Sequence, residues 1–142
     1  MVVGEILLNP AHYVDRQTGE SKPKYFLILA LSRGGDLIVR LLTSRVHGRP
    51  EQPRCFHGDP YPSFYLGILG GRLSEKSWLD LRGHPDLDCG TVQKKLQAGQ
   101  MEVVTTLDRE LLAAAMDCAA AAPDTALLQE RCIRDSLAQL RS

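Results

Sequence analysis

The sequence has no net charge, no long apolar run and no closely spaced pair of cysteines. Its 142 residues contain 17 Lys and Arg against 17 Asp and Glu, so no overall field draws the chain to nucleic acid or to an anionic membrane. The longest apolar run, residues 25–31, is far shorter than the roughly 20 residues that a membrane span needs. The first ten residues lack a basic segment before their apolar stretch, which argues against a secretory signal.

The cysteines are scattered and form no Cys-x-x-Cys motif, which argues against a dense disulfide framework and against a zinc ribbon. They are Cys55, Cys89, Cys118 and Cys132. We therefore expect a cytoplasmic chain with reduced thiols. Neither Gly-Gly pair is followed by the glycine and Lys-Ser/Thr of a phosphate-binding loop, so a nucleotide-dependent enzyme is disfavoured and no cofactor is predicted.

What is present fits one domain over residues 1–142. The composition, 44% hydrophobic and 24% charged, is close to the globular average. Before residue 106, short apolar and β-branched runs alternate with Gly, Pro and Asp clusters, which is typical of a small sheet or barrel. After it the pattern is helical, so the sequence predicts an α+β fold.

The run 24–31 is apolar on both faces and predicts a buried strand. The turn residues 32–36 join it to a strand at 37–42, so the two form a hairpin. Further strands are predicted at residues 2–8, 63–69, 77–81 and 101–105.

Three helices are predicted. A short one covers residues 91–98 and stops at Gly99. Asp108 caps a second at 109–121, which is rich in alanine. Asp124 caps a third, whose apolar residues recur at three- and four-residue spacings and form a stripe that packs on the sheet. That stripe consists of Leu128, Cys132, Ile133, Leu137 and Leu140.

A proline-rich stretch at residues 48–62 interrupts the strands, with prolines at 50, 53, 60 and 62. Proline removes the donors that a sheet interior requires, so we expect an excursion or loop, and loops of this length are often functional. The segment that leads into this stretch and overlaps its start, residues 16–54, holds eight basic residues and three acidic ones, an excess of five positive charges. Such an excess predicts a basic face suited to phosphate.

Three short motifs, in order, resemble the MazF/PemK-like toxins. Residues 4–7 (Gly-Glu-Ile-Leu) match that family's Gly-Asp-Ile-Val, and Lys22-Pro23 before the apolar strand matches its Arg-Pro. Residues 41–44 (Leu-Leu-Thr-Ser) match its Pro-Ile-Thr-Ser, and residues 100–109 resemble its last strand entering the C-terminal helix. The likeness covers about half of the chain, while residues 48–99 match only loosely.

The resemblance implies a small SH3-like β-barrel over residues 1–105, with a short inserted helix and two C-terminal helices over 107–140. It also implies a homodimer, restrained by an antitoxin protein, that cleaves single-stranded RNA without a metal. Such cleavage uses attack by the 2′-hydroxyl on its own phosphate, and it needs a base, an acid and fixed donors for the extra negative charge.

By position, Lys22 takes the place of the family's catalytic Arg, and Thr43 and Ser44 are the hydroxyl donors to phosphate. Lysine presents a point charge where arginine presents a planar fork, so the exchange changes how phosphate is held. The predicted RNA-binding residues are cations and one aromatic ring between two prolines: Lys24, Arg45, Arg49, Arg54 and Tyr61.

His47, Cys55 and His57 form a second cluster. Cys55 and His57 share a face if the segment is extended, but three residues at this spacing do not complete a zinc site, so no metal is predicted. Imidazole titrates near neutral pH, so His57 or His47 is a candidate general acid or base. Two alternatives stay open: a non-catalytic barrel that binds a partner protein or RNA, and an unrelated structural β-domain.

Overall fold

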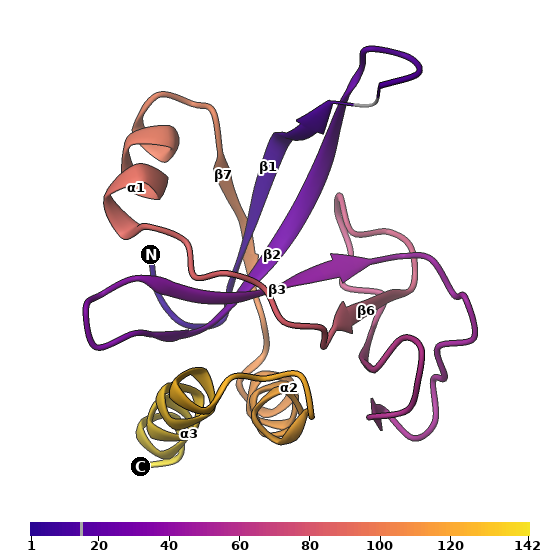
Figure 1. Cartoon of the computed structure of the whole chain (residues 1–142), viewed down its shortest axis with the longest axis vertical. Coiled ribbons are helices and arrows are strands. Elements are labelled where there is room, and N and C mark those ends of the chain that lie inside the picture. The colour runs from indigo at the N-terminus through magenta and orange to yellow at the C-terminus, as the bar shows by residue number, and fades with distance from the viewer. Residues whose placement is uncertain (15) are drawn as a thin grey trace.

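The computed structural model describes residues 1–14 and 16–142 as one antiparallel sheet and three helices (Figure 1). The strands are β1 (Glu5–Val14), β2 (Ser21–Leu31), β3 (Leu37–Thr43), β4 (Cys55–Phe56), β5 (Ser63–Gly67), β6 (Ser77–Asp80) and β7 (Glu102–Thr106). Their order in the sheet is β4-β5-β6-β3-β2-β1-β7, and the outer strands β4 and β7 do not pair with each other. The predicted α+β class is confirmed, but the sheet stays open where a barrel was expected.

The predicted hairpin forms at β2 and β3, which pair antiparallel with Leu27 opposite Arg40. In its turn, the Ser32 amide donates to the Asp36 carbonyl at 2.7 Å. Gly35 adopts a φ of 89°, which an L side chain rarely accepts. The turn residues therefore fix the register of the two central strands.

Strand β1 ends later and strand β2 begins earlier than predicted, because each strand continues through a proline. Between Asn9 and Tyr13 the pairing of β1 with β2 shifts register, so that Asn9 lies opposite Lys24 and Tyr13 opposite Lys22, on either side of Pro10 and Pro23. The pairing of β1 with β7 ends at Leu8, so Pro10 lies where β1 has become an edge strand. Proline is tolerated at edges and bulges, which explains why the predicted strand end at residue 8 was wrong.

The helices are α1 (Cys89–Gln97), α2 (Arg109–Ala121) and α3 (Leu127–Arg141). Asp88 and Asp108 cap the first two, each accepting from an amide three residues ahead. The predicted Asp124 cap is wrong, because α3 begins after Ala126, which makes no side-chain cap. Asp124 instead accepts from the Gly83 amide.

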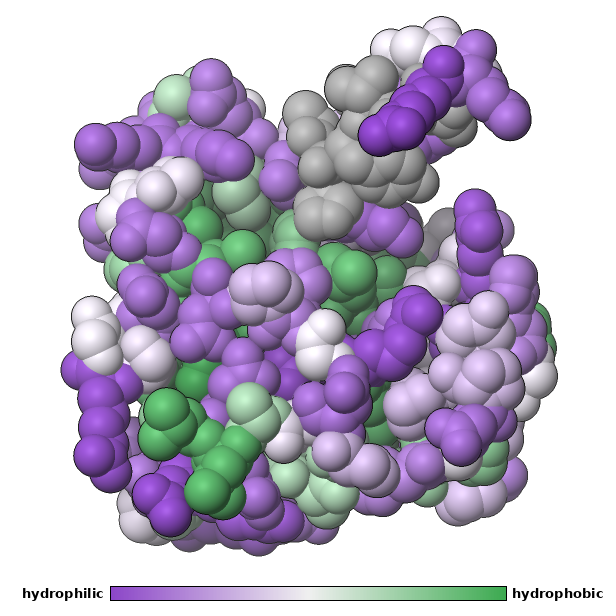
Figure 2. All heavy atoms as spheres, viewed as in Figure 1, coloured by the Kyte–Doolittle hydropathy of each residue, from purple (hydrophilic) through white to green (hydrophobic). Residues whose placement is uncertain are grey.

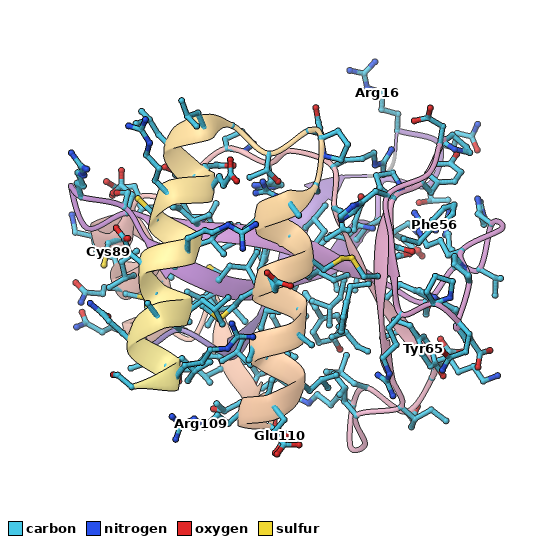
Figure 3. The ribbon with its side chains drawn as sticks, turned by 90° about the horizontal axis from the view of Figure 1, so that it is seen from below. Arg16, Phe56, Tyr65, Cys89, Arg109 and Glu110 are labelled. Atoms are coloured by element: carbon cyan, nitrogen blue, oxygen red, sulfur yellow. A yellow bond between two sulfur atoms is a disulfide. The ribbon has the colours of Figure 1, made fainter. Side chains whose placement is uncertain are left out.

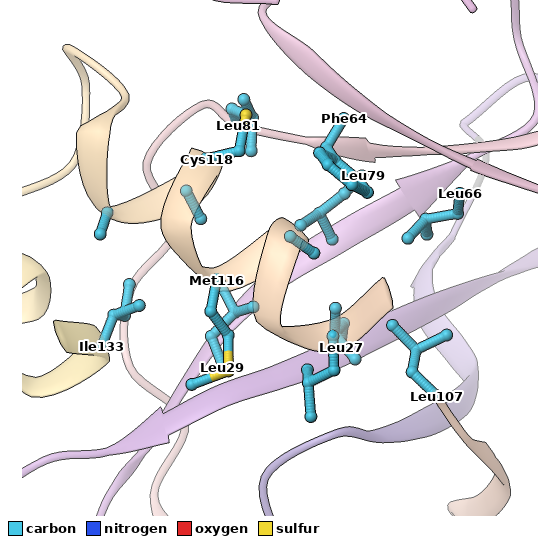
Figure 4. Packing of buried hydrophobic residues seen from close by; sticks show 14 of the residues in the cluster. Leu27, Leu29, Phe64, Leu66, Leu79, Leu81, Leu107, Met116, Cys118 and Ile133 are labelled. Atoms are coloured by element: carbon cyan, nitrogen blue, oxygen red, sulfur yellow. The ribbon is translucent and has the colours of Figure 1, made fainter. Parts of the chain in front are cut away.

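Two apolar clusters lie on opposite faces of the sheet. On one face α2 and α3 cover residues that include Leu27, Leu29 and Leu79, with Met116 and Ile133 contributed by the helices (Figure 4). On the other face α1 covers a smaller cluster that includes Phe26, Val39 and Val92. Figure 2 shows apolar residues at the floor of a recess beside α1.

A disulfide joins Cys55 of β4 to Cys118 of α2, 63 residues apart. It appears as the yellow bond beside α2 in Figure 3, at the end of the molecule that also holds Phe56 and Tyr65. The expectation that all four thiols are reduced is therefore wrong for this pair, while Cys89 and Cys132 are free. Sequence spacing gave no sign of it, because the partners come from distant elements.

Candidate functional site

The polar end of the sheet holds a hollow of about 230 Å³, which we call the β3–β6 hollow. It is lined by Lys24, Leu41, Leu42, Thr43, Arg45, His47, Arg49, Tyr61, Asp80 and Arg82. Four cations therefore face one carboxylate. The hollow brings together four of the predicted RNA-binding residues, all but Arg54.

The proline-rich excursion forms the outer wall of this hollow. Trp78 of β6 is buried and its indole Nε1 donates to the Pro50 carbonyl at 2.9 Å. Lys76 pairs with Glu51 at 2.8 Å on the outside. The excursion is thus an ordered segment held against β6, which is why residues so far apart in sequence share one surface.

Thr43 lies at the centre of the site, at the end of β3. Its Oγ1 accepts from the Arg45 amide at 3.2 Å, so its own hydrogen can be donated to an anion. A second hollow of about 240 Å³ lies on the other side of Thr43 and is also lined by Lys24 and Arg45. The two hollows share Lys24, Leu42, Thr43 and Arg45 in their linings, and we call the two together the cationic track.

Tyr61 organises the cations of the β3–β6 hollow. The Arg49 guanidinium lies 4.7 Å and the Arg82 guanidinium 5.3 Å from the centre of its ring. The His47 ring meets it edge-on at 5.9 Å. A nucleobase must displace one of these neighbours to stack on Tyr61, so the ring already serves to hold two charged groups over the hollow.

Arg49 is only 6% exposed although it carries a charge. Its Nη1 donates to the Arg45 carbonyl at 2.7 Å, and its Nε is buried with no hydrogen-bond partner in the described structure. Burial lowers the pKa of this guanidinium, against the opposing attraction of Asp80. Arg49 therefore places a buried positive charge at the wall of the hollow, which favours an anion there.

Asp80 and Arg82 form a pair that the sequence reading missed. The backbone amide and the guanidinium of Arg82 both donate to the Asp80 carboxylate, the closest contact being Nη2 to Oδ2 at 2.7 Å. Burial is the largest single influence and raises the pKa of Asp80, but the hydrogen bonds from Arg82 and the charges of Arg82 and Arg49 together outweigh it, so the net shift of the pKa is downward. Their spacing of two at the end of a predicted strand was the available signal, since such residues share a face.

His47 has a left-handed backbone, with φ of 42°. Such conformations are uncommon for residues with a side chain and are concentrated at functional sites. The imidazole is exposed at the rim of the β3–β6 hollow. Of the two histidines considered as acid or base, His47 is therefore the one beside Thr43 and the cations.

Lys22 and Ser44 are not among the residues that line the β3–β6 hollow. The Lys22 ammonium is 3.9 Å from the Glu20 carboxylate, and Lys24, two residues on, takes the position next to Thr43. Ser44 lines the second hollow and is exposed. Lysine at the position of the family's arginine thus does not line either hollow with Thr43.

Arg54 and His57 lie apart from this site. Arg54 donates to the Tyr65 carbonyl at 3.0 Å. The His57 Nε2 lies 3.0 Å from the Cys118 carbonyl and 3.3 Å from the Cys55 sulfur. The structure therefore separates His57 from Thr43, while it adds Cys118 to the cluster of Cys55 and His57.

No protein-family model, no curated protein and no solved structure matches this chain. Within the described residues, none of the helices combines the length and apolar character needed to cross a membrane.

Proposed function

We propose that the chain is a metal-independent endoribonuclease that binds single-stranded RNA along the β3–β6 hollow. The observation that carries the proposal is the convergence of Lys24, Thr43 and Arg45 with the buried Arg49 around one hollow. Phosphate needs cations and fixed donors at close range, and these four residues supply both. The SH3-like strand arrangement, homodimer and antitoxin partner implied by the resemblance to MazF/PemK-like toxins belong to the same proposal, on a sheet that is open.

In this proposal Lys24 replaces Lys22 as the cation that holds the scissile phosphate. Both lie on β2 with the same parity, but only Lys24 lines the hollow. Thr43 donates its hydroxyl to a phosphate oxygen, and Arg45 completes the cationic rim. The bound RNA strand continues past Thr43 into the second hollow, where Arg72 and Ser44 lie.

His47 supplies the proton transfer. Its imidazole takes the proton of the 2′-hydroxyl as the 2′-oxygen forms a bond to phosphorus, and the resulting imidazolium returns that proton to the 5′-oxygen as the bond from phosphorus to the 5′-oxygen breaks. The products are a cyclic phosphate and a free 5′-hydroxyl. Arg49 and Arg82, held by Tyr61, stabilise the added negative charge.

The second candidate is RNA binding without cleavage. The carboxylate of the hollow, Asp80, is engaged by Arg82, so His47 is the remaining proton carrier among the lining residues. If His47 does not act, the same cationic track holds RNA without cutting it.

The test uses purified protein and a mixed single-stranded RNA in EDTA, with anisotropy for binding and gels for fragments that end in a cyclic phosphate. We expect Lys24→Ala and Thr43→Val to weaken binding, Lys24→Ala by about tenfold or more, because charge-assisted hydrogen bonds contribute about 1.5–3 kcal/mol. The slope of log affinity against log salt should also fall by about 0.7 for Lys24→Ala. His47→Gln should keep binding but slow cleavage by about 10²–10⁴-fold.

Two further lysine variants serve as comparisons. Lys94→Ala removes an exposed charge on α1 and should leave binding unchanged. Lys22→Ala should weaken RNA binding less than Lys24→Ala does. Binding that depends more on Lys22 than on Lys24 would contradict the hollow as the site, and binding without fragments would favour the non-catalytic candidate.

A further inference from the structure

Cys55, Cys118 and His57 place three metal-ligating side chains at one point, away from the β3–β6 hollow. Their ligand atoms all lie within 4.8 Å of one another. Cys55 lies in β4, His57 directly follows that strand, and Cys118 lies in the last turn of α2. The RNA-binding proposal uses none of the three.

We propose that these side chains bind one zinc ion when the Cys55–Cys118 disulfide is reduced. A dithiol reductant supplies two electrons and two protons, is itself oxidised to a disulfide, and leaves two thiols on the protein. Zinc then displaces both thiol protons and binds the two thiolates and the imidazole. The cluster is thus a disulfide in one redox state and a metal site in the other.

The distances from the ring nitrogen to the two sulfurs already fit a zinc centre. Zinc lies about 2.3 Å from sulfur and about 2.0–2.1 Å from nitrogen, so a tetrahedral site separates sulfur from nitrogen by about 3.6 Å. The His57 Nε2 lies 3.3 Å from the Cys55 sulfur and 3.5 Å from the Cys118 sulfur. Only the two sulfurs must move apart, to about 3.8 Å, once their bond is broken.

The surroundings favour a cation at this point. The Cys118 carbonyl, in the last turn of α2, accepts from His57 Nε2 at 3.0 Å in the disulfide form. The C-terminal end of a helix carries partial negative charge, which stabilises a positive ion there. To ligate the metal, the ring moves its proton to Nδ1 and gives up that hydrogen bond.

Burial at the cluster also suits a zinc ion with one open position. Cys118 is buried and Cys55 half-buried, while His57 is exposed. Two thiolates neutralise the charge of the ion, so little charge is buried. The exposed side admits a water as the fourth ligand, as in zinc centres with three protein ligands.

The experiment compares the protein as purified in air with protein reduced by a phosphine under nitrogen and then freed of the reductant. Each is titrated with Co²⁺, whose thiolate charge-transfer and tetrahedral visible bands report the ligands, and then with Zn²⁺ in competition. We expect one metal per chain in the reduced protein and no thiolate band in the disulfide form. His57→Gln keeps both cysteines and should weaken the reduced site by at least about tenfold.

The matched control is Cys89→Ser with Cys132→Ser, which removes the free thiols and should leave the bands unchanged. Circular dichroism of each reduced variant confirms that it is folded. Folded, reduced wild-type protein without a thiolate band would overturn the proposal. So would a band that survives Cys55→Ser with Cys118→Ser.

Discussion

At the scale of single residues, Asp80 shows how a nearly buried carboxylate acquires its charge. It is 6% exposed, yet the guanidinium and backbone amide of Arg82 hold it ionised. Arg49 adds a further favourable charge. The carboxylate therefore keeps Arg82 in place beside Tyr61, at the wall of the hollow.

This arrangement makes stability depend on pH. Burial raises the pKa of Asp80, but the hydrogen bonds from Arg82 and the charges of Arg82 and Arg49 together lower it by more, so its folded pKa lies below the ordinary value. A lowered pKa contributes stability that is complete above the ordinary carboxyl pKa of about 3.9 and is lost as pH falls through the folded value. We expect Asp80→Asn to cost about 1–2 kcal/mol at neutral pH, since Arg82 stays half exposed and water screens the pair.

The measurement is urea unfolding at pH 7 and at pH 3. The difference between wild type and Asp80→Asn should shrink at the lower pH. Asp117→Asn, which breaks the exposed pair with Arg134, is the control and should change stability by less than about 0.5 kcal/mol at either pH. An Asp80→Asn penalty that is the same at both pH values would show that its cause is not the charge.

At the scale of elements, Gly4 sets how closely the start of β1 approaches α2. Its φ is 96°, and a Cβ there would lie 2.7 Å from a Leu112 methyl group. Its amide donates to Ile28 and its carbonyl accepts from Leu107, so the backbone cannot move away freely. Leu112 is itself buried in the cluster beneath the helices.

We expect Gly4→Ala to destabilise the chain by about 2–4 kcal/mol, through backbone strain and overpacking together. Gly99→Ala is the matched control, because Gly99 has φ of 73° but open space around its Cβ position. Gly99→Ala should lower the free energy of unfolding only by the backbone strain, about 1 kcal/mol. Chemical unfolding of the two variants measures the difference, and equal losses would contradict a role for the close approach to Leu112.

Elements with a strong local pattern were predictable from the sequence. The hairpin, α2 and the strand at β6 follow from turn residues, alanine content and apolar runs. Strand β4 was not predicted, because its two residues lie between prolines and gain their place only by pairing with β5. The start of α3 was missed because Asp124 bonds to Gly83, a distant partner that competes with the local cap.

The candidate site was predictable in part, for the same reason. Thr43 follows from the end of its strand and from the family resemblance, whereas Lys24 and Arg45 follow only from their charge and their nearness in sequence to the motif residues. Choosing Lys24 over Lys22 needs the bulge between β1 and β2, and finding Arg82 needs the neighbouring strand β6. Cys118 joins Cys55 only when α2 packs beside β4, so no spacing along the chain indicates it.

At the scale of the molecule, the basic segment does not become one basic face. Lys24, Arg45 and Arg49 line the hollow, but Arg40 is fully buried on the opposite face of the sheet. The Arg40 guanidinium donates to Gln129 at 2.8 Å and holds the α2–α3 region against β3. Charge density along the chain therefore overstates the charge available to an anion.

The disulfide joins the excursion side of the sheet to the helical layer. Cys55 lies just beyond the wall segment that carries His47 and Arg49, and Cys118 belongs to α2. A cross-link that closes a loop of this length restricts the unfolded chain. By the loop-entropy relation, a separation of 63 residues corresponds to about 4 kcal/mol.

We therefore expect reduction to lower the free energy of unfolding by about 2–4 kcal/mol, measured by urea unfolding with and without a phosphine. EDTA is present in both samples, so that no metal replaces the cross-link. The variant with Cys89→Ser and Cys132→Ser should respond like wild type, because these thiols are free. A response that disappears in that variant, or a change below about 1 kcal/mol in wild type, would show that the Cys55–Cys118 link does not hold these two layers together.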